Sequence, residues 1–272
     1  MEDAQIQSAA STPPAPGPSV AIRSTIYNIA FYINIVGLMI LGLPTMFMGR
    51  HAVFALARAW ARTSLWLLEK ICGTRLEFRG VENIPRGGVI VAAKHQSVLE
   101  TFALTLKFED FSYVLKRELM WIPLFGWLLK GAEQIAIDRA SGKAALQQVL
   151  ARAAAFMKQN GALFIFPEGT RRPVGAPPRY KPGVVHIYRA TGAPCLPVAL
   201  NTGVFWPRRS FMRKPGVAVI EFLPVIEPGL EDDVFARRMR DDIEAATDAL
   251  VAEAVKANPA LAPQPRPGDP SA

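Results

Sequence analysis

Residues 88–108 read GVIVAAKHQSVLETFALTLKF, which is a short apolar run, a polar turn and a second apolar segment. The run at 88–93 predicts a buried strand, and residues 98–108 predict a helix. The turn between them contains Lys94, His95, Gln96 and Ser97. Because α/β enzymes expose functional groups where a strand leads into a helix, this turn is a candidate functional site.

The same alternation of strands and helices continues on both sides of this stretch. Strands are predicted at 74–79, 88–93, 112–115, 134–137, 162–166, 195–200 and 217–222. Helices are predicted at 98–108, 118–130, 143–158, 182–190 and 231–256. Such alternation predicts an α/β domain over residues 73–258, with a mixed, mostly parallel sheet flanked by helices.

The composition limits the class of partner. The chain has 272 residues, 50% of them hydrophobic, and its mean hydropathy of +0.18 is high for a soluble protein and low for a polytopic membrane protein. A net charge of +8 favours nucleic acid, an anionic bilayer or a phosphorylated substrate, and the apolar content favours the bilayer. Cys72 and Cys195 form no Cys-x-x-Cys pattern, so we expect a reducing compartment without a zinc site or disulfide framework.

Both ends of the chain have the composition of disordered tails. Residues 1–20 are rich in Ala, Ser, Pro and Gly, and residues 259–272 contain five prolines. Between the first tail and the α/β domain, residues 21–72 are predicted to form two membrane-anchoring helices.

The anchoring prediction comes from two adjacent runs. Residues 26–48 carry no charge over 23 positions, and a bilayer-spanning helix needs about 20 apolar residues. Pro44 and the polar residues within this run weaken that interpretation, so a helix buried in one leaflet is the alternative. The helix predicted at 51–71 is basic and rich in tryptophan, which suits anionic lipid headgroups, although an ordinary domain helix with a solvated basic stripe has the same pattern.

The cations around the charge-free run predict its orientation. If the run spans, Arg50, Arg58, Arg62 and Lys70 outnumber Arg23 on the other side, and the positive-inside rule places the main domain in the cytoplasm. We therefore expect a protein at the cytoplasmic face of the cell membrane, in contact with anionic membrane lipids.

His95 and Glu100 are the first candidate pair. Five positions apart on one continuous helix, their side chains would point about 140° apart, so they can meet only if His95 precedes the helix and Glu100 lies in its first turn. A carboxylate paired in this way fixes the imidazole tautomer and stabilises the ring when it accepts a proton. The alternative is structural, because Ser97-x-x-Glu100 is also a helix capping box.

A second candidate, residues 166–172, reads FPEGTRR and comes at the end of a predicted buried strand. The proline and glycine open the turn, so backbone N–H groups can face a ligand. Thr170 adds a hydroxyl, and Arg171 adds a planar set of donors suited to phosphate. The alternative is a plain surface turn in which Glu168 pairs with an arginine.

Together, the two stretches resemble the motifs of the 1-acylglycerol-3-phosphate acyltransferase family. His-x-x-x-x-acid is followed about seventy residues later by Phe-Pro-Glu-Gly-Thr-Arg, and blocks at 136–139 (AIDR), 180–183 (YKPG) and 196–200 (LPVAL) occur in the family's order. The resemblance covers about residues 76–223. It departs at Glu100, where the family usually has aspartate, and the extra methylene can mark a subfamily with a different acceptor.

The resemblance implies the fold of glycerolipid acyltransferases and a role for each candidate. His95 would be the general base that takes the proton from the acceptor hydroxyl, and Glu100 would orient it. The acceptor would be lysophosphatidic acid and the donor acyl-CoA or acyl carrier protein, with no metal, cofactor or covalent acyl-enzyme. The second turn would position substrate or stabilise an oxyanion, and cations would hold the acceptor's phosphate. The implied substrate-binding residues are Lys116, Arg139, Glu168, Gly169, Thr170 and Arg171.

Other functions and two further runs leave alternatives open. Another lysolipid, such as a lyso-ornithine lipid, could be the acceptor, and a non-catalytic lipid-binding protein could share the fold. Residues 205–214 mix aromatics with four cations, which suits lipid headgroups or nucleic acid; lipid is favoured and no nucleic-acid partner is expected. The aromatics at 121–128 could line a route for an acyl chain, but a core position is favoured.

Overall fold

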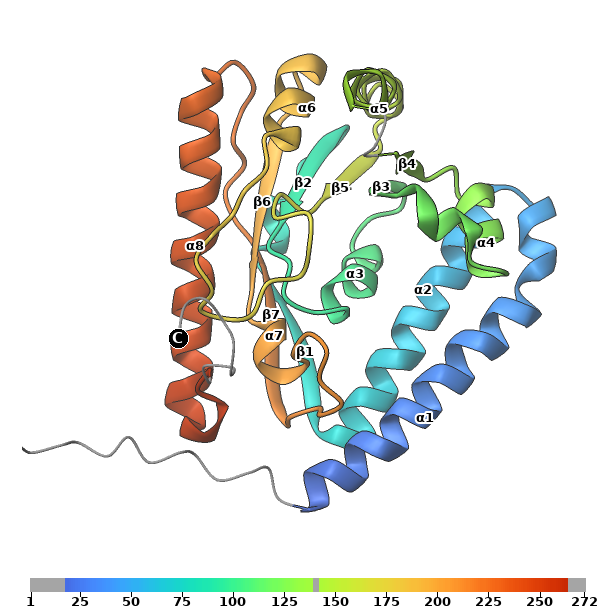
Figure 1. Cartoon of the computed structure of the whole chain (residues 1–272), viewed down its shortest axis with the longest axis vertical. Coiled ribbons are helices and arrows are strands. Elements are labelled where there is room, and N and C mark those ends of the chain that lie inside the picture. Colours follow the sequence, from blue (N-terminus) through green and yellow to red (C-terminus); the bar gives the residue numbers. More distant parts are fainter. Residues whose placement is uncertain (1–17, 139–141, 264–272) are drawn as a thin grey trace, which may run out of the picture.

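The computed structural model of the protein describes residues 18–138 and 142–263, with the backbone alone at 142–145. Within these residues, a seven-stranded sheet has the order β1-β7-β6-β2-β5-β3-β4 (Figure 1). The strands are β1 (Thr74–Arg79), β2 (Val89–Ala93), β3 (Phe111–Lys116), β4 (Ile135–Ile137), β5 (Ala162–Ile165), β6 (Cys195–Leu200) and β7 (Gly216–Phe222). Neighbouring strands are parallel except β6 and β7, which confirms the predicted mixed, mostly parallel α/β sheet.

Helices cover both faces of the sheet. They are α1 (Pro18–Leu41), α2 (Arg50–Leu67), α3 (Leu99–Ala103), α4 (Phe125–Gly131), α5 (Gly142–Met157), α6 (Gly183–Thr191), α7 (Thr202–Phe205) and α8 (Asp232–Ala257). In β2, Val89, Val91 and Ala93 belong to the core formed with α1, α2 and α3. Ile90 and Ala92 belong to the core formed with α5, α6 and α8. Because successive side chains of a strand point to opposite faces, a strand between two helical layers must be apolar throughout.

The helix predicted at 118–130 is wrong as a single element. The chain instead forms a 3₁₀ helix, η5 (Arg117–Trp121), followed by α4. Pro123 separates them, because its ring removes a backbone N–H and disfavours a helical conformation at the preceding residue. Ile122 is accordingly extended, and Leu124 turns the chain into α4 with φ 64°.

The charge-free run at 26–48 does not form one helix either. Helix α1 ends at Leu41, a 3₁₀ helix (η1, Leu43–Phe47) turns the chain, and α2 returns beside α1 (Figure 1). Pro44 begins this turn, and at Gly42 an added Cβ would lie 2.1 Å from the Leu56 side chain. Helix α1 alone, with 24 residues, is still long and apolar enough to cross a membrane.

The hairpin of α1 and α2 is fastened to the domain through part of the run at 205–214. Arg213 is buried at 6% exposure, lies 4.0 Å from the Trp206 ring, and donates to Asn28 Oδ1 of α1 at 2.7 Å. Burial lowers the pKa of Arg213 to about 10. Tyr27 of α1 packs edge-on against Trp206. This part of the run is therefore a structural contact within the protein.

The bounds predicted for the two disordered tails include residues that form helices in the structure. Helix α1 begins at Pro18, inside the predicted tail at 1–20. A 3₁₀ helix (η7, Pro259–Leu261) follows α8, and Leu261 is buried in a small apolar cluster that also contains Phe205. The remaining tail residues lie outside the described ranges. The other short elements are η2 (Leu68–Cys72, a π-helical turn), η3 (Val81–Asn83) and η4 (Leu104–Leu106).

Candidate active site

The two candidate turns meet at the C-terminal edge of the sheet. Strands β2 and β5 are parallel neighbours, with Ala92 opposite Ile165, so the residues that follow them emerge side by side. The backbone N–H of Arg172 donates to the carbonyl oxygen of His95 at 2.7 Å, and the Phe166 ring stacks on the imidazole at 4.0 Å. The two stretches singled out by sequence therefore form one site.

His95 and Glu100 are in contact, as the dyad interpretation requires. His95 Nδ1 lies 3.0 Å from Glu100 Oε1; the Glu100 side chain is 0% exposed and the His95 side chain is 14% exposed. His95 lies before α3 and Glu100 in its first turn, which is the only arrangement that the sequence spacing allowed. With a carboxylate at Nδ1, the imidazole carries its proton there and keeps a lone pair on Nε2.

The same carboxylate also caps the turn, so the dyad and capping interpretations of Glu100 are both present. Oε1 accepts the backbone N–H groups of Gln96 at 2.9 Å and Ser97 at 2.7 Å. Oε2 accepts the hydroxyl of Thr202 at 2.7 Å. These bonds compensate the burial of the carboxylate and prevent it from rotating. Thr202 was missed by sequence reasoning, although it follows β6, the other neighbour of β2.

Glu168 faces inward, toward the backbone of the first turn. Its Oε2 accepts the His95 N–H at 3.0 Å, and its Oε1 accepts Lys94 Nζ at 3.0 Å. Burial raises the pKa of Glu168, and the positive charge of Lys94 partly opposes this. The partner is thus a lysine rather than an arginine, and both oxygens that were expected to bind substrate are already engaged within the protein.

The remaining turn residues differ in what they present. Gly169 adopts φ 65°, and an added Cβ would lie 3.1 Å from Lys181 Nζ, so a larger residue would be strained there. Its N–H, expected to help at an oxyanion, donates to the Phe166 carbonyl at 2.8 Å. Thr170 is exposed and Arg171 is half-buried. These last two side chains remain available to a ligand at the rim of the site.

Two other implied phosphate ligands stand apart from the turns. Lys116 is exposed at the C-terminal end of β3, which is parallel to β5 and therefore ends at the same edge of the sheet as His95. Arg139 lies outside the described residues. The structure thus brings His95, Glu100 and the turn after β5 together, and it places Lys116 farther along the same edge.

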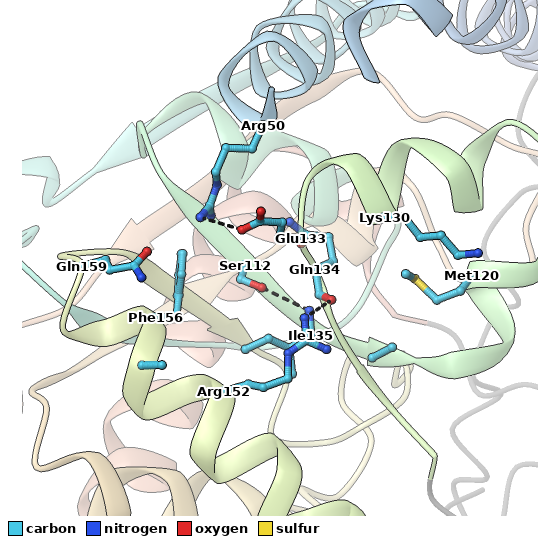
Figure 2. A pocket seen from close by; sticks show the side chains of 12 residues that line it. Arg50, Ser112, Met120, Lys130, Glu133, Gln134, Ile135, Arg152, Phe156 and Gln159 are labelled. Carbon is cyan, nitrogen blue, oxygen red and sulfur yellow. Dashed lines mark hydrogen bonds and ion pairs between the residues drawn. The ribbon is translucent and has the colours of Figure 1, made fainter. Parts of the chain in front are cut away.

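A cavity of about 390 Å³ lies away from this chemistry (Figure 2). Ser112 near the start of β3 and Gln134 before β4 line it, which places it toward the opposite edge of the sheet from His95. Arg50 points into it and is paired with Glu133 at 3.3 Å. No residue of the dyad lines this cavity, so it is separate from the candidate active site.

Comparison with known proteins identifies the family. A family model described as "Acyltransferase" matches residues 75–201, a range that includes both turns. A 1-acyl-sn-glycerol-3-phosphate acyltransferase of Pseudomonas aeruginosa is 38% identical over 194 residues, which is 71% of this chain and 74% of that protein. The chain belongs to the 1-acyl-sn-glycerol-3-phosphate acyltransferase family. The family predicted from the motifs is thereby confirmed, and the protein is an acyltransferase.

More distant members of the acyltransferase family agree over a longer range. A chloroplastic 1-acyl-sn-glycerol-3-phosphate acyltransferase of Arabidopsis thaliana is 26% identical over 259 residues, covering 89% of this chain and 70% of that protein. The solved structure of the 1-acyl-sn-glycerophosphate acyltransferase PlsC from Thermotoga maritima matches with a TM-score of 0.68 at 22% identity, covering 85% of this chain and 98% of PlsC. That likeness confirms the fold.

Proposed function

We propose that this protein is a 1-acyl-sn-glycerol-3-phosphate O-acyltransferase, which moves an acyl group from a thioester to the sn-2 hydroxyl of lysophosphatidic acid and forms phosphatidic acid. The observation that carries this proposal is the 3.0 Å contact between His95 Nδ1 and Glu100 Oε1 at the C-terminal edge of the sheet. The names of the relatives support the choice of acceptor.

The geometry favours direct attack by the acceptor. With Nδ1 held by Glu100, Nε2 of His95 takes the proton of the acceptor hydroxyl while its oxygen bonds to the thioester carbonyl carbon. The tetrahedral oxyanion then collapses, the C–S bond breaks, and the imidazolium returns the proton to the thiolate. The buried carboxylate of Glu100 stabilises the imidazolium between these steps. The scheme uses acyl-CoA or acyl carrier protein as donor and requires neither a metal, a cofactor nor a covalent acyl-enzyme.

Cations at the rim supply the contact to the acceptor's phosphate. Arg171 follows the turn after β5, and its guanidinium can bind phosphate with two parallel hydrogen bonds. Lys116, at the end of β3, adds a second positive charge at the same edge. We retain Arg139 as the third member of this set on the motif resemblance alone. Glu168, with both oxygens engaged, is assigned to holding the turn rather than to contacting substrate.

The N-terminal hairpin gives the enzyme a surface suited to a membrane. Six exposed apolar residues of α1 recur every three or four positions: Ile22, Ile26, Ile29, Ile33, Val36 and Ile40. This spacing places them on one stripe of the helix, opposite Tyr27 and Phe31, which are buried. Phe47 of η1 is 92% exposed, and Trp121 is 64% exposed on η5 rather than in a core. An apolar stripe with aromatic residues at one end is typical of interfacial helices.

We infer that α1 lies within one leaflet and does not cross the bilayer. Its inner face contacts the domain, where Ser24 Oγ accepts the N–H of Arg213 at 2.8 Å, so only the outer face is free for lipid. The hairpin's cations, including Arg58 and Arg62, add attraction of about 1 kcal/mol each near an anionic surface. The buried free thiols of Cys72 and Cys195 support the cytoplasmic face, since they suit a reducing compartment.

An acyl-transfer assay with a panel of lysolipids tests the function. The full-length protein is supplied with acyl-CoA or acyl carrier protein as donor, and products are identified by mass spectrometry. We expect phosphatidic acid from lysophosphatidic acid at the highest kcat/KM. Faster transfer to a lyso-ornithine lipid would identify that lipid as the acceptor instead of lysophosphatidic acid. Lipid binding without transfer to any acceptor would show a non-catalytic lipid-binding protein with this fold.

The membrane assignment has its own measurement. Carbonate washing strips shallow interfacial proteins from membranes and leaves spanning helices in the pellet. We expect the protein to appear in the wash. Retention in the pellet would support a spanning α1, and a full-length protein found entirely in the soluble fraction would overturn the anchor.

A further inference from the structure

A buried chain of charges links the last long helix to the candidate general base. Lys94 Nζ lies 2.6 Å from Glu244 Oε1 of α8 and 3.0 Å from Glu168 Oε1. Glu168 Oε2 in turn accepts the His95 N–H at 3.0 Å. Tyr180 donates its hydroxyl to Glu244 Oε1 at 2.8 Å. These contacts therefore connect Glu244 of α8, through the side chains of Lys94 and Glu168, to the backbone of His95.

The burial of these groups makes their pairing costly to break. The side chain of Lys94 is 3% exposed and that of Glu168 is 0% exposed, whereas Glu244 is 21% exposed. A buried ammonium needs its hydrogen bonds satisfied, and a buried carboxylate needs a cation. Lys94 meets both needs only while it lies between the two glutamates. Removing Glu244 takes away one of its two anionic partners and frees it to shift.

We infer that Glu244 is a positioning residue for acyl transfer, which fixes Lys94 and, through Glu168, the backbone of His95. Glu244 lies 150 residues from Lys94 and outside the range 75–201 that the family model matches. A helix beyond the matched range would thus help to set the geometry of the reaction. The inference rests on the proposed function, because it concerns the rate of the step that His95 performs.

A purely structural role for Glu244 predicts different behaviour. If the network only held α8 against the sheet, its loss would lower the melting temperature and leave kcat of the remaining folded protein unchanged. If it positions His95, kcat falls while the KM values for donor and acceptor stay nearly constant, because Glu244 acts on His95 only through Lys94 and Glu168. A cavity of about 210 Å³ beside Lys94 and Glu244 gives a substituted side chain room without overpacking.

The first experiment compares three variants of the full-length enzyme in the transfer assay. Glu244→Gln keeps the size of the side chain and removes its charge, and we expect kcat to fall on the order of tenfold with KM changed less than about twofold. Tyr180→Phe, a milder change, should lower kcat in the same direction and by less. Asp242→Asn is the matched control, since Asp242 lies on the same helix in an exposed pair with Arg238, and it should leave kcat unchanged.

The second experiment reads the sign of the coupling between Lys94 and Glu244. Lys94→Gln leaves two carboxylates facing each other without a cation, so adding Glu244→Gln should restore part of the lost activity although it is harmful in the wild type. Wild-type kcat in both Glu244→Gln and Tyr180→Phe, or losses that simply add in the double variant, would overturn the inference. Absence of transfer by the wild type would instead overturn the proposed function.

Discussion

Replacing Glu100 with glutamine separates the two tasks that its carboxylate performs. The amide oxygen can take the place of Oε1 and keep the bonds to His95 Nδ1, Gln96 N–H and Ser97 N–H. The amide nitrogen then faces Thr202, whose hydroxyl can rotate to accept instead of donate. The cap therefore survives, and we expect a stability cost of about 1–3 kcal/mol from exchanging charged for neutral hydrogen bonds.

The activity should fall much further than the stability, because the amide cannot neutralise the imidazolium. A loss of about 10²–10⁴-fold in kcat is expected for a general base without its charge partner, or about 2.7–5.4 kcal/mol of transition-state stabilisation. The assay is the initial rate of transfer beside thermal unfolding of the same sample. Glu100→Asp, which installs the family's usual residue, should keep partial activity. A fully active Glu100→Gln with a lowered melting temperature would refute the dyad and leave Glu100 as a cap alone.

Three further outcomes follow from the site and the hairpin. Arg171→Ala should raise the acceptor KM, because it removes a charge-assisted hydrogen bond worth about 1.5–3 kcal/mol, and should change the donor KM little; an equal rise in both KM values would make Arg171 structural. Gly169→Ala should cost about 1–2 kcal/mol of stability from the left-handed backbone at φ 65°, together with activity; an unchanged melting temperature would contradict this. The double change Ile29→Glu and Ile33→Glu should reduce binding to anionic vesicles, whereas Val234→Glu, at an exposed position of α8, should not; equal binding by all three proteins would remove the stripe from the membrane contact.

The parts of the fold that sequence predicted correctly depend on local patterns. The continuous apolar run of β2 indicated a strand with both faces covered, and β6 has the predicted bounds. The pairing of His95 with Glu100 could also be predicted, since both lie within one turn and the start of one short helix. The short backbone between them brings the two side chains together. Distant parts of the chain then add the bond from Thr202 to Glu100, the stacking of Phe166 on the imidazole and the bond from the His95 N–H to Glu168.

The wrong helix predictions arose where a long apolar run was interpreted as one helix although it contained a proline. Pro123 divides the predicted helix at 118–130, and the proline itself was a sufficient signal. In the run at 26–48, Pro44 was a similar signal, and the chain turns at Gly42, where the side chain of Leu56 from the returning helix leaves no room for a Cβ. That contact depends on how α2 packs, which hydropathy along the sequence does not contain.

The network behind the site could not be predicted from the sequence. Lys94 resembled an ordinary charge next to His95, and Glu244 lies in a helix whose neighbours Asp241 and Asp242 are exposed. Only the packing of α8 against the sheet decides which of its acids turns inward. Glu168 and Glu244 lie 74 and 150 positions after Lys94 in the sequence, yet both contact its ammonium group. The topology of the fold brings them together.

The central claim is that His95 is the general base of acyl transfer to a lysolipid. The most direct test is the rate of phosphatidic acid formation by purified His95→Ala beside the wild type, with matched melting curves for the two proteins. We predict a folded variant whose kcat is lower by about 10²–10⁴-fold or more, since base and carboxylate act as a unit. A correctly folded His95→Ala that keeps most of the wild-type rate would contradict the account.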